Sequence, residues 1–273
     1  ISGYFGIKPS VKGVVNFILW CAFYSVVIYA IYTIAKPTQY NILDLIESFG
    51  IFSHTDLWFI PAYFALYIIA PIINKGIADL KAKPFILLLC GLTFINVYLG
   101  WGWRHKINPT GYNVMQLIYI YIIGRFLKVH ISRYRNIKHW YIVGYIASFL
   151  LIALSTLFCK STMAFAYNSP FVISASAFFF LIFTSFRFYS PNINFIASSA
   201  FAVYLIHKMP PIWNDLKNLL IDNTKNADPF TFTLFWVLFI ALIFSSCITI
   251  DKFRELVTKP LSHFITKQIK RII

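Results

Sequence analysis

Many of the side chains able to bind a sugar or accept a proton lie at the ends of apolar stretches of this sequence. One group is in SHTDLWFIPAYF, a second in GWGWRHKINPTGYN and a third in FAVYLIHKMPP. The residues concerned are His54, Trp58, Arg104, His105, Tyr204 and His207. Indole rings stack on the face of a sugar, and arginine and histidine bond its hydroxyl groups. A polar cavity shared by the three groups would therefore suit a sugar.

Each group also has a plainer interpretation. Trp and Tyr near the end of a spanning helix commonly mark the aromatic belt at the membrane surface. Arg104 could extend its charge to the lipid headgroups. His207 follows Tyr204 by three residues, so the two side chains share one face of a helix. Three histidine-bearing groups at one depth favour a shared cavity over three separate anchors.

A second set of candidate residues is basic and could meet the phosphates of a nucleotide-bearing substrate. Its members are Lys8, Lys12, Arg125, Lys128, Arg133 and Arg135. Arg125 follows the apolar run IYIYIIG, and a charge in such a run should face protein or water rather than lipid. The alternative is that these cations only mark the cytoplasmic side of the membrane, where Lys and Arg collect.

Several other kinds of chemistry lack a signature in the sequence. There is no glycine-rich phosphate loop, no Gly-x-Ser-x-Gly elbow and no His-Glu-x-x-His motif. The four cysteines are scattered singly without metal-ligand spacing, so no metal site is expected. Only nine residues are acidic, which weakens the case for a proton-coupled transporter.

The composition indicates that membrane-spanning helices position these residues. Hydrophobic residues make up 59% of the chain and charged residues 12%, against about 25% charged in soluble proteins. The mean hydropathy is +0.70. A net charge of +15 would suggest nucleic acid in a soluble protein, but here it reflects Lys and Arg on the cytoplasmic side. We expect an all-α, polytopic integral membrane protein that contacts the lipid bilayer and no nucleic acid.

Eight apolar stretches qualify or nearly qualify as spanning helices, since a bilayer core of about 30 Å needs about 20 residues per helix. They are residues 14–35, 57–74, 84–103, 113–128, 139–159, 170–186, 193–207 and 229–250. The seventh is short, and Arg125 interrupts the fourth. No repeat or low-complexity linker divides the chain, so a single membrane domain over residues 1–273 is predicted.

The connecting segments predict which side of the membrane each end of the chain occupies. Alternate segments carry 17 and 7 of the 24 Lys and Arg residues, and the richer side should be cytoplasmic. Both ends then face the cytoplasm, with the protein in the bacterial cytoplasmic membrane. Residues 251–273 form a basic tail, expected to be an amphipathic helix in the membrane interface or, alternatively, to be disordered.

Three motifs resemble those of the membrane-bound acyltransferase-3 family and occur in the family's order. Ser2-Gly3-Tyr4 is similar to the Ser-Gly-Phe/Tyr motif that follows the family's second helix. Leu57-Trp58-Phe59, with Tyr67 and Pro71 further on, is similar to its Leu-Trp-Phe helix. Tyr204-Leu205-Ile206-His207 resembles the Tyr-Leu-Ile-His motif near its end. The resemblance covers nearly the whole chain.

The resemblance implies an enzyme that O-acylates extracytoplasmic acceptors with acyl-CoA from the cytoplasm. It also implies two helices before Ser-Gly-Tyr, the first carrying the histidine that acts as general base. The catalytic residue is thus expected upstream of Ile1, and the chain is expected to be an N-terminally truncated fragment, inactive alone. The family often has Arg-x-x-Arg after this motif, whereas this chain has Lys8 and Lys12. Lysine lacks the bidentate fork of arginine, which weakens the case for donor binding through these two residues.

The resemblance therefore predicts transfer of an acyl group, in the first place acetyl, to a hydroxyl of an extracytoplasmic glycan of the cell envelope. The acceptor would meet His54, Trp58, Arg104, His105, Tyr204 and His207. The donor would meet Lys8, Lys12 and Arg125. Acyl-CoA is a co-substrate, and no permanently bound cofactor is expected. The alternatives are a lipid-linked glycan flippase or other transporter, which would share the helices and the aromatic rim, and a non-catalytic membrane scaffold.

Overall fold

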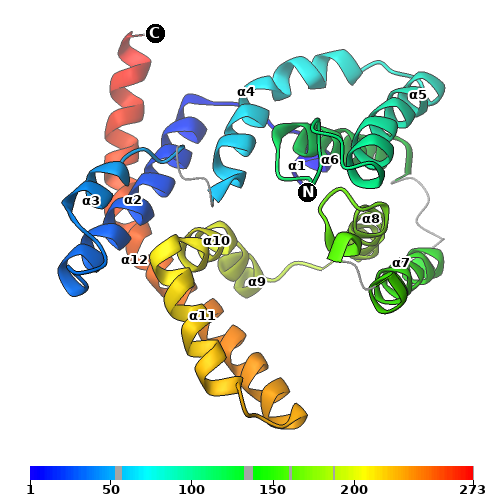
Figure 1. Cartoon of the computed structure of the whole chain (residues 1–273). Coiled ribbons are helices and arrows are strands. Elements are labelled where there is room, and N and C mark those ends of the chain that lie inside the picture. Colours follow the sequence, from blue (N-terminus) through cyan, green and yellow to red (C-terminus); the bar gives the residue numbers. More distant parts are fainter. Residues whose placement is uncertain (53–56, 132–137, 160–161, 187, 273) are drawn as a thin grey trace. The chain divides into compact units, whose positions relative to one another are not determined.

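The computed structural model describes residues 1–52, 57–131, 138–159, 162–186 and 188–272, and the regular structure of these residues is entirely helical (Figure 1). Among them, seven helices are long and apolar enough to cross a membrane. They are Val11–Ala35, Phe59–Ile77, Ala82–Gly102, Val114–Ile131, Lys138–Phe158, Thr162–Thr184 and Pro229–Ile269. The predicted all-α, polytopic membrane fold is confirmed.

Large apolar side chains cover the surface of these helices. Leu87 is 74% exposed, Leu157 is 71% exposed and Phe158 is 80% exposed. Soluble proteins rarely carry extended apolar surface of this kind, because water would drive it to associate. A bilayer removes the difficulty, since lipid chains solvate these side chains and the helices satisfy their own backbone hydrogen bonds.

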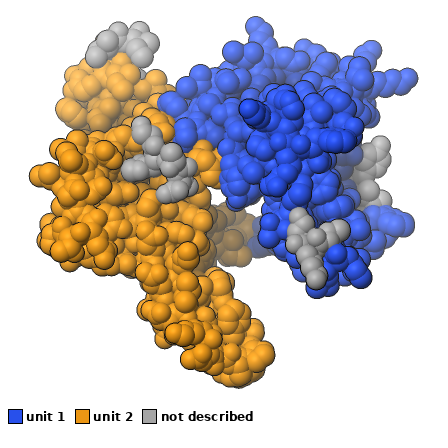
Figure 2. All heavy atoms as spheres, viewed as in Figure 1, with its two compact units in different colours: residues 1–9, 61–188 blue, residues 10–60, 189–273 orange. Residues whose placement is uncertain are grey.

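The chain forms two compact units, which Figure 2 shows in different colours. Unit 1 comprises Ile1–Pro9 and Pro61–Phe188. Unit 2 comprises Ser10–Ile60 and Tyr189–Ile273. Each unit combines segments that are distant in the sequence, so neither unit corresponds to one half of the chain.

Unit 1 is built from the helices that follow the Ser-Gly-Tyr segment and from that segment itself. Its elements are α1 (Ser2–Phe5), most of α4 (Phe59–Ile77), α5 (Ala82–Thr93), η2 (Phe94–Gly102), α6 (Val114–Phe126), η3 (Leu127–Ile131), α7 (Lys138–Cys159), η5 (Thr162–Phe165) and α8 (Pro170–Thr184). The π-helical segment η2 continues α5, and the π-helical segment η3 continues α6. Helix α1 packs on α6, and α7 packs along α8. Since π-helical turns are rare and frequently mark functional sites, η2 and η3 draw attention to the residues beside them.

Unit 2 has its core where α2, α10 and α12 pack together. Its elements are α2 (Val11–Ala35), α3 (Ile42–Glu47), α9 (Pro191–Ala197), α10 (Ala200–Lys208), α11 (Pro210–Thr224) and α12 (Pro229–Ile272). Tyr24, Leu205 and Met209 are fully or almost fully buried in this core. Ser10 caps α2 by accepting a hydrogen bond from the backbone N–H of Gly13 at 3.1 Å.

Two predicted elements differ in the structure. The stretch 193–207, expected to be one spanning helix, is divided between α9 and α10 and is not among the seven candidate spans. The hydroxyl of Ser198 donates to the Phe195 carbonyl at 2.8 Å, and a serine bonded to its own backbone in this way competes with helix continuation.

The second difference concerns the tail. The helix expected at 229–250 does not end there but continues as α12 to Ile272, through the segment predicted to be a separate basic tail. With 44 residues, α12 is about 66 Å long, well beyond a bilayer core of about 30 Å. The helix continues because the tail segment has a packing partner in α2. Its predicted place in the cytoplasmic interface stays a prediction.

Candidate functional site

The Ser2-Gly3-Tyr4 segment forms α1, which packs closely on α6 in unit 1. A Cβ atom added to Gly3 would lie 2.1 Å from the carbonyl oxygen of Tyr121. On the facing helix, a Cβ atom added to Gly124 would lie 2.9 Å from the backbone nitrogen of Tyr4. Only glycine allows the two backbones to approach this closely. The glycine of the motif therefore fixes α1 against α6.

Three hydrogen bonds hold the chain directly after α1. The backbone N–H of Ile7 donates to the Tyr121 hydroxyl at 2.9 Å. The Tyr121 hydroxyl donates to Asn74 Oδ1 at 2.7 Å, and Asn74 Nδ2 donates to the Ile7 carbonyl at 3.0 Å. Ile7 and Tyr121 are buried, so water does not readily replace these bonds. The ring of bonds ties the residue between Gly6 and Lys8 to both α4 and α6.

Arg125 lies at the end of α6 beside Gly6. Gly6 has a φ of 79°, and a Cβ atom there would lie 3.3 Å from Nη1 of Arg125. Glycine therefore suits both the backbone angle and the close guanidinium. Lys128 places its Nζ 4.7 Å from the centre of the Tyr4 ring, and Lys8 is exposed. We call Arg125 and Lys128, together with Lys8 two residues after Gly6 in the sequence, the basic cluster.

The basic cluster has the properties of an anion-binding site. The Nε of Arg125 is buried and has no hydrogen-bond partner in the described part of the chain. A buried donor without an acceptor is costly, and a phosphate oxygen would supply the acceptor. Arginine can also bind two phosphate oxygens at once through its planar fork. The cluster is therefore suited to a phosphate-bearing ligand.

Four carboxamide side chains are buried together at the other end of α6. They are Asn96, Asn108, Gln116 and Asn168, each 0% exposed. Asn108 Nδ2 donates to Asn96 Oδ1 at 2.7 Å and to Gln116 Oε1 at 3.0 Å. Asn168 Nδ2 donates to the Asn108 carbonyl at 2.5 Å. This amide cluster joins η2, α6 and the start of α8, and buried networks of this kind make a loop rigid.

The loop held by the amide cluster carries Arg104 at the wall of a cavity of about 270 Å³. Trp101, Thr110 and Tyr112 also line this Arg104 pocket. Arg104 has a φ of 49°, a left-handed conformation uncommon for residues other than glycine and often found at functional sites. The indole N–H of Trp101 donates to the Met163 carbonyl at 2.8 Å, which fixes the ring. Rings, a hydroxyl and a guanidinium in one pocket suit a sugar.

Two of the predicted histidines have tautomers defined by backbone contacts. The N–H of Ile107 donates to Nδ1 of His105 at 3.3 Å, so neutral His105 carries its proton on Nε2 and donates from there. Nδ1 of His207 lies 2.5 Å from the Val203 carbonyl oxygen, which can only accept. Neutral His207 therefore carries its proton on Nδ1 and keeps a lone pair on Nε2. Of these two histidines, His207 has the tautomer of a general base.

Aromatic rings connect Trp58 with His207 in unit 2. The centre of the Trp58 ring lies 6.0 Å from that of Phe59, which lies 5.6 Å from that of Tyr204. The Tyr204 ring centre lies 6.4 Å from that of His207. His207 also lines an apolar groove of about 510 Å³ formed by α10, α11 and α12. The Leu-Trp-Phe and Tyr-Leu-Ile-His motifs thus meet within one unit.

The predicted site residues are divided between the two units. Unit 1 holds Lys8, Arg104, His105 and Arg125. Unit 2 holds Lys12, Trp58, Tyr204 and His207. The ninth residue, His54, lies outside the described residues. The cavity predicted to be shared by the three histidine-bearing groups stays a prediction.

Two polar groups of the structure were not predicted from the sequence. Asn96 and Gln116 fall within the predicted helices 84–103 and 113–128, where a polar side chain is costly, and this signal could have pointed to the amide cluster. The buried pair Asp251 and Arg254 follows an apolar run at a spacing of three residues, which places both side chains on one helical face. Their burial could not be foreseen without knowing that α2 packs on α12.

The fold and site define a class: a polytopic helical membrane protein in which one spanning helix joins a basic cluster to an arginine-bearing aromatic pocket. Residues 2–251 match the family model of the acyltransferase-3 domain, described as an acyltransferase domain. The chain belongs to this family, as its three motifs predicted, and the family is one of membrane acyltransferases. Neither the curated proteins nor the solved structures contain a match to the chain.

Proposed function

We propose that this membrane acyltransferase transfers an acetyl group from acetyl-CoA to a hydroxyl of an extracytoplasmic glycan. The observation that carries the proposal is the arrangement along α6. Arg125 with the basic cluster lies at one end of this helix, and the Arg104 pocket lies beside the other end. Arg125 follows Asn113 by 12 positions, which corresponds to roughly 18 Å along the helix. A charged donor and a neutral sugar would thus approach from opposite ends of one rigid helix.

The basic cluster is assigned to the donor. Coenzyme A carries several phosphates, and Arg125 offers a half-buried guanidinium whose buried Nε lacks a partner among the described residues. Lys8, exposed on the segment that Tyr121 holds, would add a second positive charge. On the predicted topology, this end of α6 faces the cytoplasm, where acyl-CoA is found.

The Arg104 pocket is assigned to the acceptor. Trp101 offers a ring face, and Arg104 and Thr110 offer donors to sugar hydroxyls. In the reaction, the acceptor oxygen attacks the thioester carbonyl, the new C–O ester bond forms and the C–S bond breaks. A base takes the hydroxyl proton, and the sulfur leaves as the coenzyme A thiol after protonation. The family resemblance makes that base a histidine.

The proposal is tested with membranes from cells that express the complete gene. These membranes are incubated with acetyl-CoA labelled in its acetyl group, and the cell-envelope glycan is isolated. Label should appear in the glycan and should be released by hydroxylamine, which cleaves esters. A glycan that crosses the membrane without gaining label would instead support a flippase, and label on protein or lipid alone would contradict the glycan acceptor.

A further inference from the structure

One face of the C-terminal part of α12 is polar and buried against α2 in unit 2. Its residues, spaced three or four apart and each no more than 8% exposed, are Asp251, Arg254, Thr258, Ser262 and Thr266. The intervening apolar side chains point away, and Phe253, Leu256 and Val257 are 64–72% exposed. Lipid can cover these apolar side chains, whereas the polar face packs against protein. The partners of this polar face are therefore found inside unit 2.

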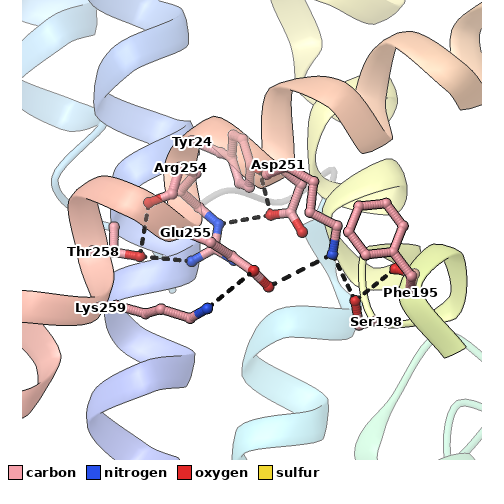
Figure 3. Close-up of polar contacts among 9 residues, drawn as sticks. Tyr24, Phe195, Ser198, Asp251, Arg254, Glu255, Thr258 and Lys259 are labelled. Carbon is pink, nitrogen blue, oxygen red and sulfur yellow. Dashed lines mark hydrogen bonds and ion pairs between the residues drawn. The ribbon is translucent and has the colours of Figure 1, made fainter. Parts of the chain in front are cut away.

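A hydrogen-bonded network organises this polar face (Figure 3). Asp251 Oδ1 accepts from the Tyr24 hydroxyl at 2.7 Å and from Arg254 Nε at 2.7 Å. Nη1 of Arg254 donates to the Thr258 hydroxyl at 2.8 Å. The Arg254 guanidinium carbon also lies 4.5 Å from the centre of the Trp20 ring. The guanidinium is thus fixed on two sides, with its charge balanced by Asp251.

Beside this network is a cavity of about 150 Å³ lined mainly by hydrogen-bonding side chains. Its polar walls come from Asn16, Trp20, Arg254, Thr258, Lys259 and Ser262. The indole N–H of Trp20 is buried and has no hydrogen-bond partner in the part of the chain that is described. Ser262 donates to Asn16 Oδ1, which leaves the amide NH₂ of Asn16 as a further donor. The cavity therefore offers more donors than acceptors.

The charges around the cavity favour an anion. Glu255 also lines it, but its carboxylate lies 3.5 Å from Lys259 Nζ and 3.8 Å from Lys252 Nζ. Of the residues that line the cavity, two are cations, Arg254 and Lys259, and one is an acid, Glu255. The side chain of Lys259 is 74% exposed, so its ammonium group can turn from Glu255 to a ligand.

We propose that this cavity binds a phosphate group carried by a nucleotide or by a phospholipid headgroup. An Arg guanidinium, an exposed lysine, an indole N–H and the free amide NH₂ of Asn16 can donate to the oxygens of a phosphate, whereas the hydroxyls of Thr258 and Ser262 already donate to Arg254 and Asn16. The volume corresponds to about five water molecules, enough for the phosphate but too small for a whole nucleotide or lipid. The site is formed by residues of unit 2 and shares no residue with the basic cluster, and its argument does not depend on the donor assigned above.

Binding to the full chain in nanodiscs of neutral phosphatidylcholine tests the proposal. Calorimetric titration uses inorganic phosphate and the bisphosphorylated adenosine part of coenzyme A. A second set of nanodiscs contains phosphatidylglycerol, and the unfolding temperature is compared between the two sets. The test variants are Trp20→Phe, which removes the unpartnered N–H but keeps a ring, and Lys259→Gln. The control is Lys267→Gln, which removes an exposed charge two turns further along the same helix.

Each test variant should weaken phosphate binding roughly tenfold, the loss expected for one charge-assisted hydrogen bond, whereas Lys267→Gln should not. A nucleotide source is identified if the adenosine bisphosphate binds in this variant-dependent manner. A lipid source is identified if phosphatidylglycerol raises the unfolding temperature of the wild type and of Lys267→Gln but not of the test variants. If no probe distinguishes Lys259→Gln from Lys267→Gln, the proposal is wrong. The surface position of Lys259 keeps this comparison clear of folding defects.

Discussion

Replacing Tyr121 with phenylalanine should loosen the segment after α1 that carries Gly6 and Lys8. In the structure the Tyr121 hydroxyl accepts from the Ile7 N–H at 2.9 Å and donates to Asn74 Oδ1 at 2.7 Å. Phenylalanine keeps the ring but removes both bonds. The Ile7 N–H is then left buried without an acceptor, at a cost of about 1–3 kcal/mol. Asn74 is only half-buried, so water can replace the bond it loses.

Tyr119→Phe is a matched control on the same helix. The Tyr119 hydroxyl lies 2.8 Å from that of Thr93, but Thr93 also donates to the Leu89 carbonyl at 2.7 Å and keeps that bond. This control should cost at most about 1 kcal/mol, the value of an ordinary hydrogen bond. Reversible unfolding in mixed micelles measures the loss of unfolding free energy in each of the two variants.

The same two variants should also differ in donor use. Because Tyr121 positions the segment that carries Lys8 and Gly6, Tyr121→Phe should raise the KM for acyl-CoA, and Tyr119→Phe should leave it unchanged. If both variants lose the same stability and show the same donor KM, the ring of hydrogen bonds does not position the donor site.

Three further predictions concern packing, pH and topology. Gly3→Ala should destabilise the protein by about 1–3 kcal/mol, because its Cβ atom would meet a backbone carbonyl of α6 at 2.1 Å; unchanged unfolding would refute the close packing. The hydrogen bond from Lys36 lowers the pKa of Asp215 below its usual value, so the ionised pair stabilises the folded state. Because the pair is half-exposed, this stabilisation at neutral pH is about 0.2–1 kcal/mol, and it disappears as Asp215 is protonated below a pH of about 4. Asp215→Asn should therefore reduce unfolding free energy at pH 7 but not near pH 2, and an equal loss at both would contradict this reasoning. In a variant without native cysteines, Lys106→Cys should react with an impermeant thiol reagent added outside cells, and Lys83→Cys should not. The reverse labelling pattern would show that the predicted topology is inverted.

Hydropathy predicted most of the spanning helices because long apolar runs have few alternatives in a membrane protein. It failed where local polar groups or distant partners decide the structure. The break at Ser198 depends on a side chain bonding to its own backbone, and hydropathy does not register that bond. The continuation of α12 past Asp251 depends on Tyr24, 227 residues away in the sequence, as a partner for the buried carboxylate.

Single residues of the candidate site could be predicted from the sequence, but the contacts among them could not. An arginine after an apolar run pointed to Arg125, and the structure adds its neighbour Gly6 and the unpartnered Nε. The cluster of aromatic and basic residues pointed to Arg104, but the four amides that hold its loop come from η2, α6 and two connecting segments. Contacts among such distant segments are set by tertiary packing, which no local pattern encodes.

The proposed donor site at the basic cluster and acceptor site at the Arg104 pocket are tested most directly by steady-state kinetics. Arg125→Ala and Arg104→Ala are measured in reconstituted membranes, with donor and acceptor varied separately. A lost charge-assisted hydrogen bond is worth about 1.5–3 kcal/mol, or roughly ten- to a hundredfold in affinity. Arg125→Ala should raise the donor KM by that factor and leave the acceptor KM nearly unchanged, while Arg104→Ala should do the reverse. If Arg125→Ala alters only acceptor dependence, or if both variants behave as the wild type, the proposed arrangement along α6 is wrong.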